Sequence, residues 1–158
     1  MTAPVVLVLP YPISANRYWA TRVIRSRETG RTMATMYVTS EAVAYKADVG
    51  WRAKRAGLRI PLDGRVAWHI RLFPQRPQDW AKRAQRNPDG WDDDVRCIDL
   101  GNCEKVLADA LNGIAWLDDK QIRRTVLERM EPDGQARVEV TIGRLAQIAV
   151  APDLFAAA

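Results

Sequence analysis

The chain has 158 residues, 47% of them hydrophobic, which is enough to bury one core of ordinary size and excludes a large multidomain protein. Lysine and arginine total 24 against 19 aspartate and glutamate residues, a balance that suits a protein with a polyanionic partner such as nucleic acid. No apolar run reaches the length of a membrane helix and the first residues lack the order of a signal peptide, so we expect a cytoplasmic protein without a membrane partner.

The N-terminal residues predict a strand followed by a basic arm. Residues 5–9 form a β-branched apolar run that ends at Pro10, which is typical of a buried strand. The segment 18–31 carries arginines against a single glutamate, with aromatic residues at its start, and we interpret it as an electropositive arm. Residues 32–38 predict a second strand that can pair with a neighbour.

The middle of the chain predicts a helix and a well-defined strand. We expect the helix from about residue 41 to residue 55, with Thr39 or Ser40 at its start. Residues that recur at helical spacing form its expected buried face: Ala42, Tyr45, Val49 and Ala53. In residues 65–72, apolar and polar side chains alternate, which is the pattern of a half-buried strand.

The C-terminal half predicts a long loop, a second helix and a hairpin. Residues 75–96 are polar and highly charged, and a loop of that length is usually functional or mobile. The second helix ends at Asn112-Gly113, and its apolar stripe comprises Cys103, Val106, Leu107, Ala110, Leu111 and Ile114. Residues 121–130 and 136–142 flank a Pro-Asp-Gly turn and predict a terminal β-hairpin.

Carboxylates occur at the start of this second helix and before the strand that follows it. Asp99 holds the cap position, while Asp118 and Asp119 stand at the mouth of the next strand. Mg²⁺ prefers oxygen ligands and commonly uses one or two carboxylates with water and a substrate phosphate, so these acids suggest a magnesium site. Spacing alone favours the simpler interpretation, in which Asp99 is a helix cap, the acidic pair a turn and Lys105 a solvated lysine.

Several segments, in order and spacing, resemble the RusA family of endodeoxyribonucleases. They are residues 98–105 (IDLGNCEK), 109–111 (DAL) and 116–121 (WLDDKQ). The opening at residues 9–12 (LPYP) is also similar to that family's opening, so the resemblance covers most of residues 5–142. Together these motifs are specific, whereas each alone is weak.

The resemblance implies resolution of four-way junctions and other branched DNA by a homodimer, each subunit nicking one strand by Mg²⁺-dependent hydrolysis, with Mn²⁺ as an alternative ion. It implies an α+β fold, a single domain with a mixed β-sheet of four to five strands and two main helices packed on it. We expect this domain to span residues 1–144, followed by a C-terminal tail of residues 145–158. Many members come from phages and prophages, which implies a bacterial host cell.

Residue by residue, Asp99 matches the family's first metal-binding aspartate, Asp119 the last and Lys105 the essential lysine. Asp118 and Asn102 match positions beside them. The resemblance therefore implies that Asp99, Asp118 and Asp119 bind metal, and that Asp99, Lys105 and Asp119 are catalytic. Lys105 would stabilise charge on the scissile phosphate or assist the leaving oxygen.

The sequence departs from the family at Gly101, where the family normally has a second aspartate two residues after the first. Glycine supplies no side-chain oxygen, so one metal ligand is missing. The chain then cleaves with fewer protein ligands, uses another acid such as Glu104 or one of residues 92–94, or binds junctions without cutting them. It also remains open that the chain is an unrelated soluble protein whose basic arm contacts RNA or a protein, with Asp99 purely structural.

A second departure is the basic insert of residues 75–96, which either follows a DNA backbone, with Trp80 stacking on a base, or is a mobile loop covering the sheet edge. Residues of the opening, the arm and the insert are expected to bind nucleic acid: Asn16, Arg17, Arg22, Arg76, Lys82 and Arg83.

Overall fold

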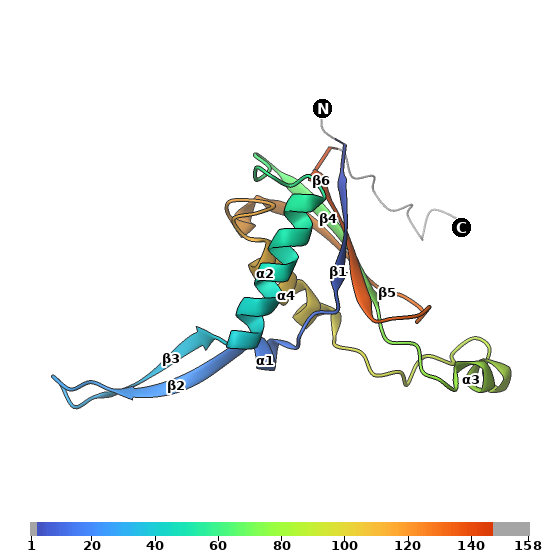
Figure 1. Cartoon of the computed structure of the whole chain (residues 1–158), viewed down its shortest axis with the longest axis horizontal. Helices are drawn as coiled ribbons and strands as arrows, with labels where there is room; N and C mark the ends of the chain where they lie inside the picture. The colour runs from blue at the N-terminus through green and yellow to red at the C-terminus, as the bar shows by residue number, and fades with distance from the viewer. Residues whose placement is uncertain (1–2, 147–158) are drawn as a thin grey trace, which may run out of the picture.

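A computed structural model describes residues 3–146 as a mixed four-stranded sheet with helices on one face and a separate two-stranded ribbon (Figure 1). The elements in chain order are β1 (Val5–Pro10), α1 (Ala15–Tyr18), β2 (Trp19–Arg25), β3 (Thr32–Val38), α2 (Ser40–Arg55), β4 (Val66–Phe73), α3 (Trp80–Arg86), α4 (Leu100–Leu111), the 3-10 helix η1 (Asp119–Gln121), β5 (Ile122–Arg129) and β6 (Arg137–Arg144). The predicted α+β class, with one domain and a mixed sheet, is confirmed.

The core forms between one face of the sheet and the inner faces of α2 and α4. Both predicted helix faces are buried: Ala42, Tyr45, Val49 and Ala53 in α2, and Cys103, Val106, Leu107, Ala110 and Leu111 in α4. Ile114, the last member of the predicted α4 stripe, lies beyond the helix and is half-buried. The rings of Trp68 and Trp116 meet edge to face, with centroids 5.1 Å apart, and burial of such large apolar surfaces is the main stabilising term of the fold.

The strand order is β1-β6-β4-β5, so the predicted hairpin of residues 121–130 and 136–142 is wrong, although both strands exist. β4 lies between them, parallel to β5 and antiparallel to β6. β4 is the most buried strand, with six of its eight residues buried, because its central position covers both edges and most of both faces. A strand parallel to β4 must be reached by a crossover, and α4 supplies that connection.

The long predicted loop of residues 75–96 contains the short helix α3, which sequence patterns did not indicate. Trp80 at the start of α3 lies 6.2 Å, between ring centroids, from Trp91. The Trp91 indole donates a hydrogen bond of 3.0 Å to Glu131, beyond the end of β5, and so attaches the insert to the sheet. Aromatic packing within the insert, rather than helical periodicity, therefore orders this segment.

The predicted basic arm of residues 18–31 begins at the last residue of α1 and continues as β2 and the turn that leads into β3, and the ribbon of β2 and β3 projects from the body (Figure 1). Thr39 closes the base of this ribbon, because its amide donates to the Tyr18 carbonyl at 3.0 Å and its hydroxyl donates to the Arg17 carbonyl at 2.7 Å. The same hydroxyl accepts from the Ala42 amide at 3.2 Å and caps α2, which confirms the predicted helix start.

The predicted boundary between a domain of residues 1–144 and a tail of residues 145–158 stays a prediction, since residues 147–158 lie outside the described part of the chain. Within residues 3–146, no helix combines the length and apolarity that crossing a membrane requires.

Tyr18 anchors the start of the ribbon to α4, and its loss should be measurable. Its buried hydroxyl donates to the Asp109 carboxylate, which also accepts from Lys46 at 3.3 Å. We expect Tyr18→Phe to lower the free energy of unfolding by about 1–2 kcal/mol, because the carboxylate loses a partner in a half-buried site. Urea denaturation measures this, with Tyr37→Phe on the exposed ribbon as the matched control. Equal midpoints for both variants would show that the Tyr18 hydroxyl contributes nothing.

Candidate functional site

Asp99 is the N-cap of α4, as the sequence predicted. Its carboxylate accepts a hydrogen bond of 2.7 Å from the Asn102 amide and a second one from the Asn102 side chain. The residue is exposed, so its oxygens keep lone pairs that face solvent. A capping carboxylate at a helix start is therefore also available to a cation, with Asn102 fixing its orientation.

Tyr11 fixes the segment that leads into Asp99. Its hydroxyl accepts from the Ile98 amide at 3.0 Å and donates to the Cys97 thiol at 3.4 Å. Burial and the hydrogen bond to Cys97 raise the pKa of Tyr11 to about 12, so the phenol remains a donor at neutral pH. The tyrosine belongs to the LPYP segment at the N-terminus, but its positioning role could not be assigned without knowing which residues lie beside it.

A basic groove of about 400 Å³ opens beside Ile98, next to Asp99. Two arginines line it, Arg17 from α1 and Arg96 from the end of the insert. Arg17 is paired with Glu41 at 2.5 Å, whereas the exposed Arg96 forms no hydrogen bond or ion pair within residues 3–146. Sequence reasoning missed Arg96, and only its position three residues before Asp99 could have pointed to it.

Asp118 and Asp119 lie at the other end of α4, around η1. The Asp118 carboxylate accepts from the Lys120 amide at 2.9 Å, and the Gln121 side chain closes a capping box. The backbone hydrogen bond from Lys120, with a further one involving Asp119, holds the pKa of Asp118 below its usual value. Asp119 is exposed at the first residue of η1, so both acids can meet a cation.

The structure separates Asp99 from Asp119 within one subunit. Ile98 is held by Tyr11 at the end of the sheet where β1 stops, while Gln121 donates to the carbonyls of Leu62 and Gly64, just before β4 starts. α4 has 12 residues and lies between these points. A helix of that length spans about 18 Å, whereas Mg²⁺ binds oxygens at about 2.0–2.1 Å. One subunit alone therefore cannot hold a single ion with both carboxylates.

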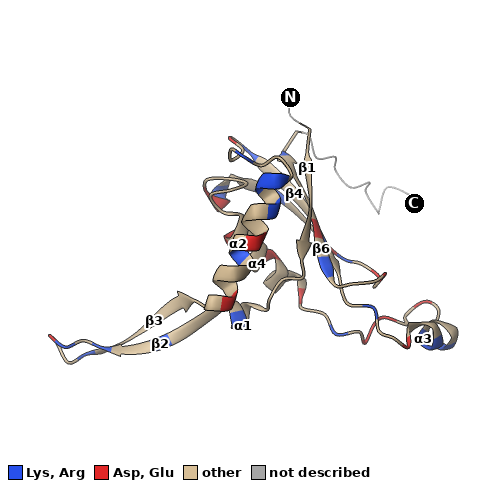
Figure 2. Cartoon of the chain, viewed as in Figure 1, with Lys and Arg blue, Asp and Glu red and all other residues tan. Residues whose placement is uncertain are grey.

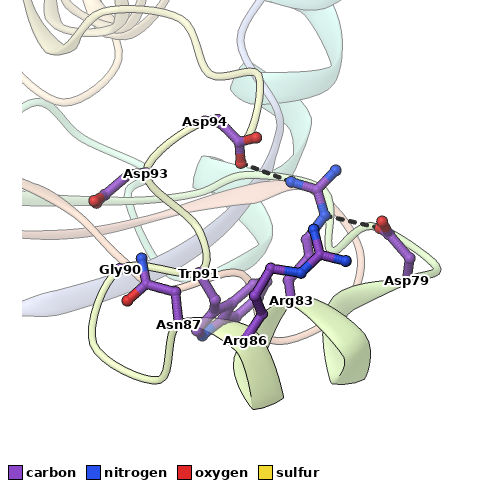
Figure 3. Close-up of a pocket in the computed structure, with 8 residues that line it drawn as sticks. All are labelled: Asp79, Arg83, Arg86, Asn87, Gly90, Trp91, Asp93 and Asp94. Carbon is purple, nitrogen blue, oxygen red and sulfur yellow. Dashed lines mark hydrogen bonds and ion pairs between the residues drawn. The ribbon is translucent and has the colours of Figure 1, made fainter.

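No other acid completes a site beside Asp99. Within residues 3–146, no three histidine, cysteine, aspartate or glutamate side chains come together in a way that could hold a metal ion. Asp94 of the acidic run is bound by Arg83 at 2.6 Å, on the insert (Figure 3). Replacement of the missing ligand by residues 92–94 therefore has no support in a single subunit.

Gly101 is not required by the backbone. It is exposed, it lacks the positive φ that favours glycine, and a Cβ added there would lie 3.5 Å from an Asp99 carboxylate oxygen, an ordinary contact. An aspartate side chain at this position would begin beside Asp99. Lys105, about one turn after Gly101 along α4, is exposed and has no ion pair within the described residues.

The predicted nucleic-acid-binding residues fall on separate parts of the surface (Figure 2). Asn16 and Arg17 lie in α1, Arg22 in β2, and the remaining three on the insert: Arg76, Lys82 and Arg83. Arg83 bonds both Asp79 and Asp94, and the hydrogen bond to Asp79 raises its pKa. Its charge is thus largely compensated, while Lys82 is exposed and Arg76 stacks over Trp80, its guanidinium carbon 4.9 Å from the ring centroid.

Comparison with protein families matches the chain to the family model described as endodeoxyribonuclease RusA, over residues 10–143. The matched region runs from the last residue of β1 to nearly the end of β6 and includes both acidic segments. A search of curated proteins finds no match.

The capping role of Asp99 can be separated from its charge by two substitutions. Asparagine caps helices about as well as aspartate, whereas alanine cannot accept the amide hydrogen bond. We expect Asp99→Ala to lower the free energy of unfolding by about 1 kcal/mol and Asp99→Asn to stay within about 0.5 kcal/mol of wild type. Thermal and urea denaturation measure both. If Asp99→Asn were as unstable as Asp99→Ala, the negative charge rather than the cap would stabilise the helix start.

Proposed function

The chain belongs to the RusA endodeoxyribonuclease family, and we propose that it resolves Holliday junctions and other branched DNA by Mg²⁺-dependent hydrolysis, as a homodimer that makes paired nicks. The observation that carries the proposal is the exposed Asp99 carboxylate, held by Asn102 beside a groove lined by Arg17 and Arg96. Carboxylate oxygens next to cationic side chains suit a phosphodiester bound through a divalent ion.

In this proposal, Asp99 and Asp119, with Asp118 beside it, hold the ion. A bound Mg²⁺ supplies a water of lowered pKa and polarises the phosphoryl oxygen. Arg17 and Arg96 position the phosphate in the groove, and Lys105 neutralises the charge that builds on the scissile phosphate or the leaving oxygen. Arg22, Arg76 and Lys82 bind phosphates further from the cut, while Asn16 contacts the strand near Arg17.

The separation of the acids along α4 supports the homodimer. Because Asp99 and Asp119 of one subunit lie about a helix length apart, an ion bound by both types of residue needs Asp119 from a second copy of the chain. Two-fold symmetry would then form two equivalent sites, one for each strand to be nicked.

A second candidate function is favoured by Gly101. With one metal ligand fewer than the family pattern, the chain would bind junctions and cut them slowly or not at all. The surroundings of Gly101 admit an aspartate without backbone change. A single Gly101→Asp substitution would therefore convert a junction-binding protein into an active nuclease.

We expect a labelled four-way junction to be nicked symmetrically in Mg²⁺, and Asp119→Asn to lose at least about 100-fold in rate, because the ion loses a charged ligand. Gly101→Asp should raise cleavage by about tenfold or more. Gly101→Ala is the matched control, since it improves helix propensity by about 1 kcal/mol or less without adding an oxygen.

Binding in Ca²⁺ distinguishes the two functions. Tight junction binding with cleavage only after Gly101→Asp would establish the impaired junction-binding protein instead of the active nuclease. Equal affinity for four-way and linear DNA would contradict both.

Mixing two inactive variants tests whether the site is shared between subunits. In Gly101→Asp protein, combining Asp99→Asn subunits with Asp119→Asn subunits should restore nicking on one strand, because each mixed dimer contains one intact site and one site lacking both acids. We expect recovery of about a quarter of the activity, from half of the dimers with one of two sites. Gel assays on junctions labelled in each strand measure it. If each subunit held its own site, no mixture would recover activity.

A further inference from the structure

The ribbon of β2 and β3 is the most exposed part of the described chain. All seven residues of β3 and five of the seven in β2 are exposed, and the ribbon extends away from the sheet and helices (Figure 1). Isolated two-stranded hairpins are marginally stable in water, so an arm of this kind gains stability when it lies against a partner.

The two strands carry exposed apolar side chains on both faces of the ribbon, with the two most exposed, Val23 and Met36, on one face and Ile24 and Met33 on the other. Their register pairs Thr21 with Met36 and Val23 with Ala34, so these side chains point to the same side. Val23 is 70% exposed and Met36 67%, values far above those of apolar side chains with a packing role. A row of exposed apolar side chains on a ribbon marks a contact surface.

The distal end of the ribbon is basic. Arg25, Arg27 and Arg31 lie at or beside the turn, with Glu28 as the acid among them (Figure 2). None of the three arginines forms an ion pair within residues 3–146. Arg25 lies on the same face as Val23, two residues further along β2. Apolar side chains are therefore followed along the arm by uncompensated positive charge.

The shape of the ribbon matches a DNA groove. Strands of seven residues span about 23 Å, and the major groove, about 12 Å wide, admits a two-stranded β-ribbon. In such a contact, apolar side chains meet base edges such as thymine methyl groups, and arginines meet phosphates. Thr32 and Thr35 add hydroxyl donors along β3.

Charge favours DNA over a second copy of this chain as the occupant of the ribbon. The whole chain carries a formal charge of +5, so the basic tip of the ribbon would approach a like-charged molecule. A duplex carries one negative charge for about every 1.7 Å of its axis. Each phosphate that an arginine neutralises releases a condensed counterion, which favours binding.

We propose that the β2–β3 ribbon is a duplex-binding arm that lies in the major groove of a DNA arm away from the cut. Val23 and Met36 face the base edges, and Arg25, Arg27 and Arg31 neutralise phosphates at the far side of the groove. The arm's role in junction cleavage rests on the proposed function, but duplex binding by the ribbon does not require the metal site.

Four full-length proteins test this proposal: wild type, an arm triple variant, a control triple variant and an apolar variant. The arm variant carries Arg25→Gln, Arg27→Gln and Arg31→Gln. The control removes the same charge at and just beyond the end of α2 that lies away from the ribbon, through Lys54→Gln, Arg55→Gln and Arg59→Gln, which are all exposed. The apolar variant carries Val23→Thr and Met36→Thr, which keep charge and strand propensity. Affinity for a linear duplex in Ca²⁺ is measured between about 50 and 200 mM salt.

We expect the arm variant to bind the duplex at least about tenfold more weakly and to reduce the slope of log affinity against log salt by about 3. The apolar variant should also bind more weakly, with an unchanged slope. The control variant should keep the wild-type slope and an affinity within about twofold, because its charges lie at the end of α2 away from the ribbon, and salt screens charges over such distances. Light scattering should give all four proteins the same mass.

Wild-type affinity in the arm and apolar variants would overturn the proposal. A reduced mass in either variant would also overturn it, because the ribbon would then join two copies of the chain. Failure of the nuclease proposal gives a different result: no Mg²⁺-dependent nicking, even by Gly101→Asp, while the pattern of duplex affinities remains.

Discussion

Because β5 runs parallel to β4, the chain must return along the whole sheet through α4 before β5 can begin. This crossover places Asp99 and the Asp118–Asp119 pair at opposite ends of one helix, whose inner face is buried. The inner stripe of α4 is packed against the sheet, so the helix cannot shift to bring the acids together without losing its core contacts. The distance between the acidic groups, and hence the need for a second copy in the proposed site, follows from this one connection.

Two tyrosines determine how the N-terminal segment lies along the same helix. Tyr11 bonds the segment just before α4, and Tyr18 bonds Asp109 in its last turn. The residues between them line the basic groove, and the ribbon leaves the body directly after Tyr18. The groove beside Asp99 and the direction of the arm therefore depend on two phenol hydroxyls, one held just before α4 begins and the other in its last turn.

Much of the local structure could be predicted from the sequence, because it depends on residues close together in the chain. The buried faces of α2 and α4, the Asp99 cap and the strand at residues 32–38 all follow from periodicity and capping chemistry. The order of strands could not be predicted. The turn after Met130 has the same sequence whether β6 pairs directly with β5 or passes β4 and pairs with its other edge. The motifs at residues 98–105 and 116–121 suggested one site because they are close in sequence, although α4 holds them apart.

The hydrogen bonds of Thr39 couple the ribbon mechanically to α2. Its single hydroxyl donates to the Arg17 carbonyl at the base of the ribbon and accepts from the Ala42 amide in the first turn of α2. A force applied to the tip of the ribbon acts about 23 Å from its base, where the Thr39 hydrogen bonds lie. Tension on the arm is therefore transmitted to the start of α2, whose inner face packs against α4, so that a pull from outside reaches the helix that carries Asp99.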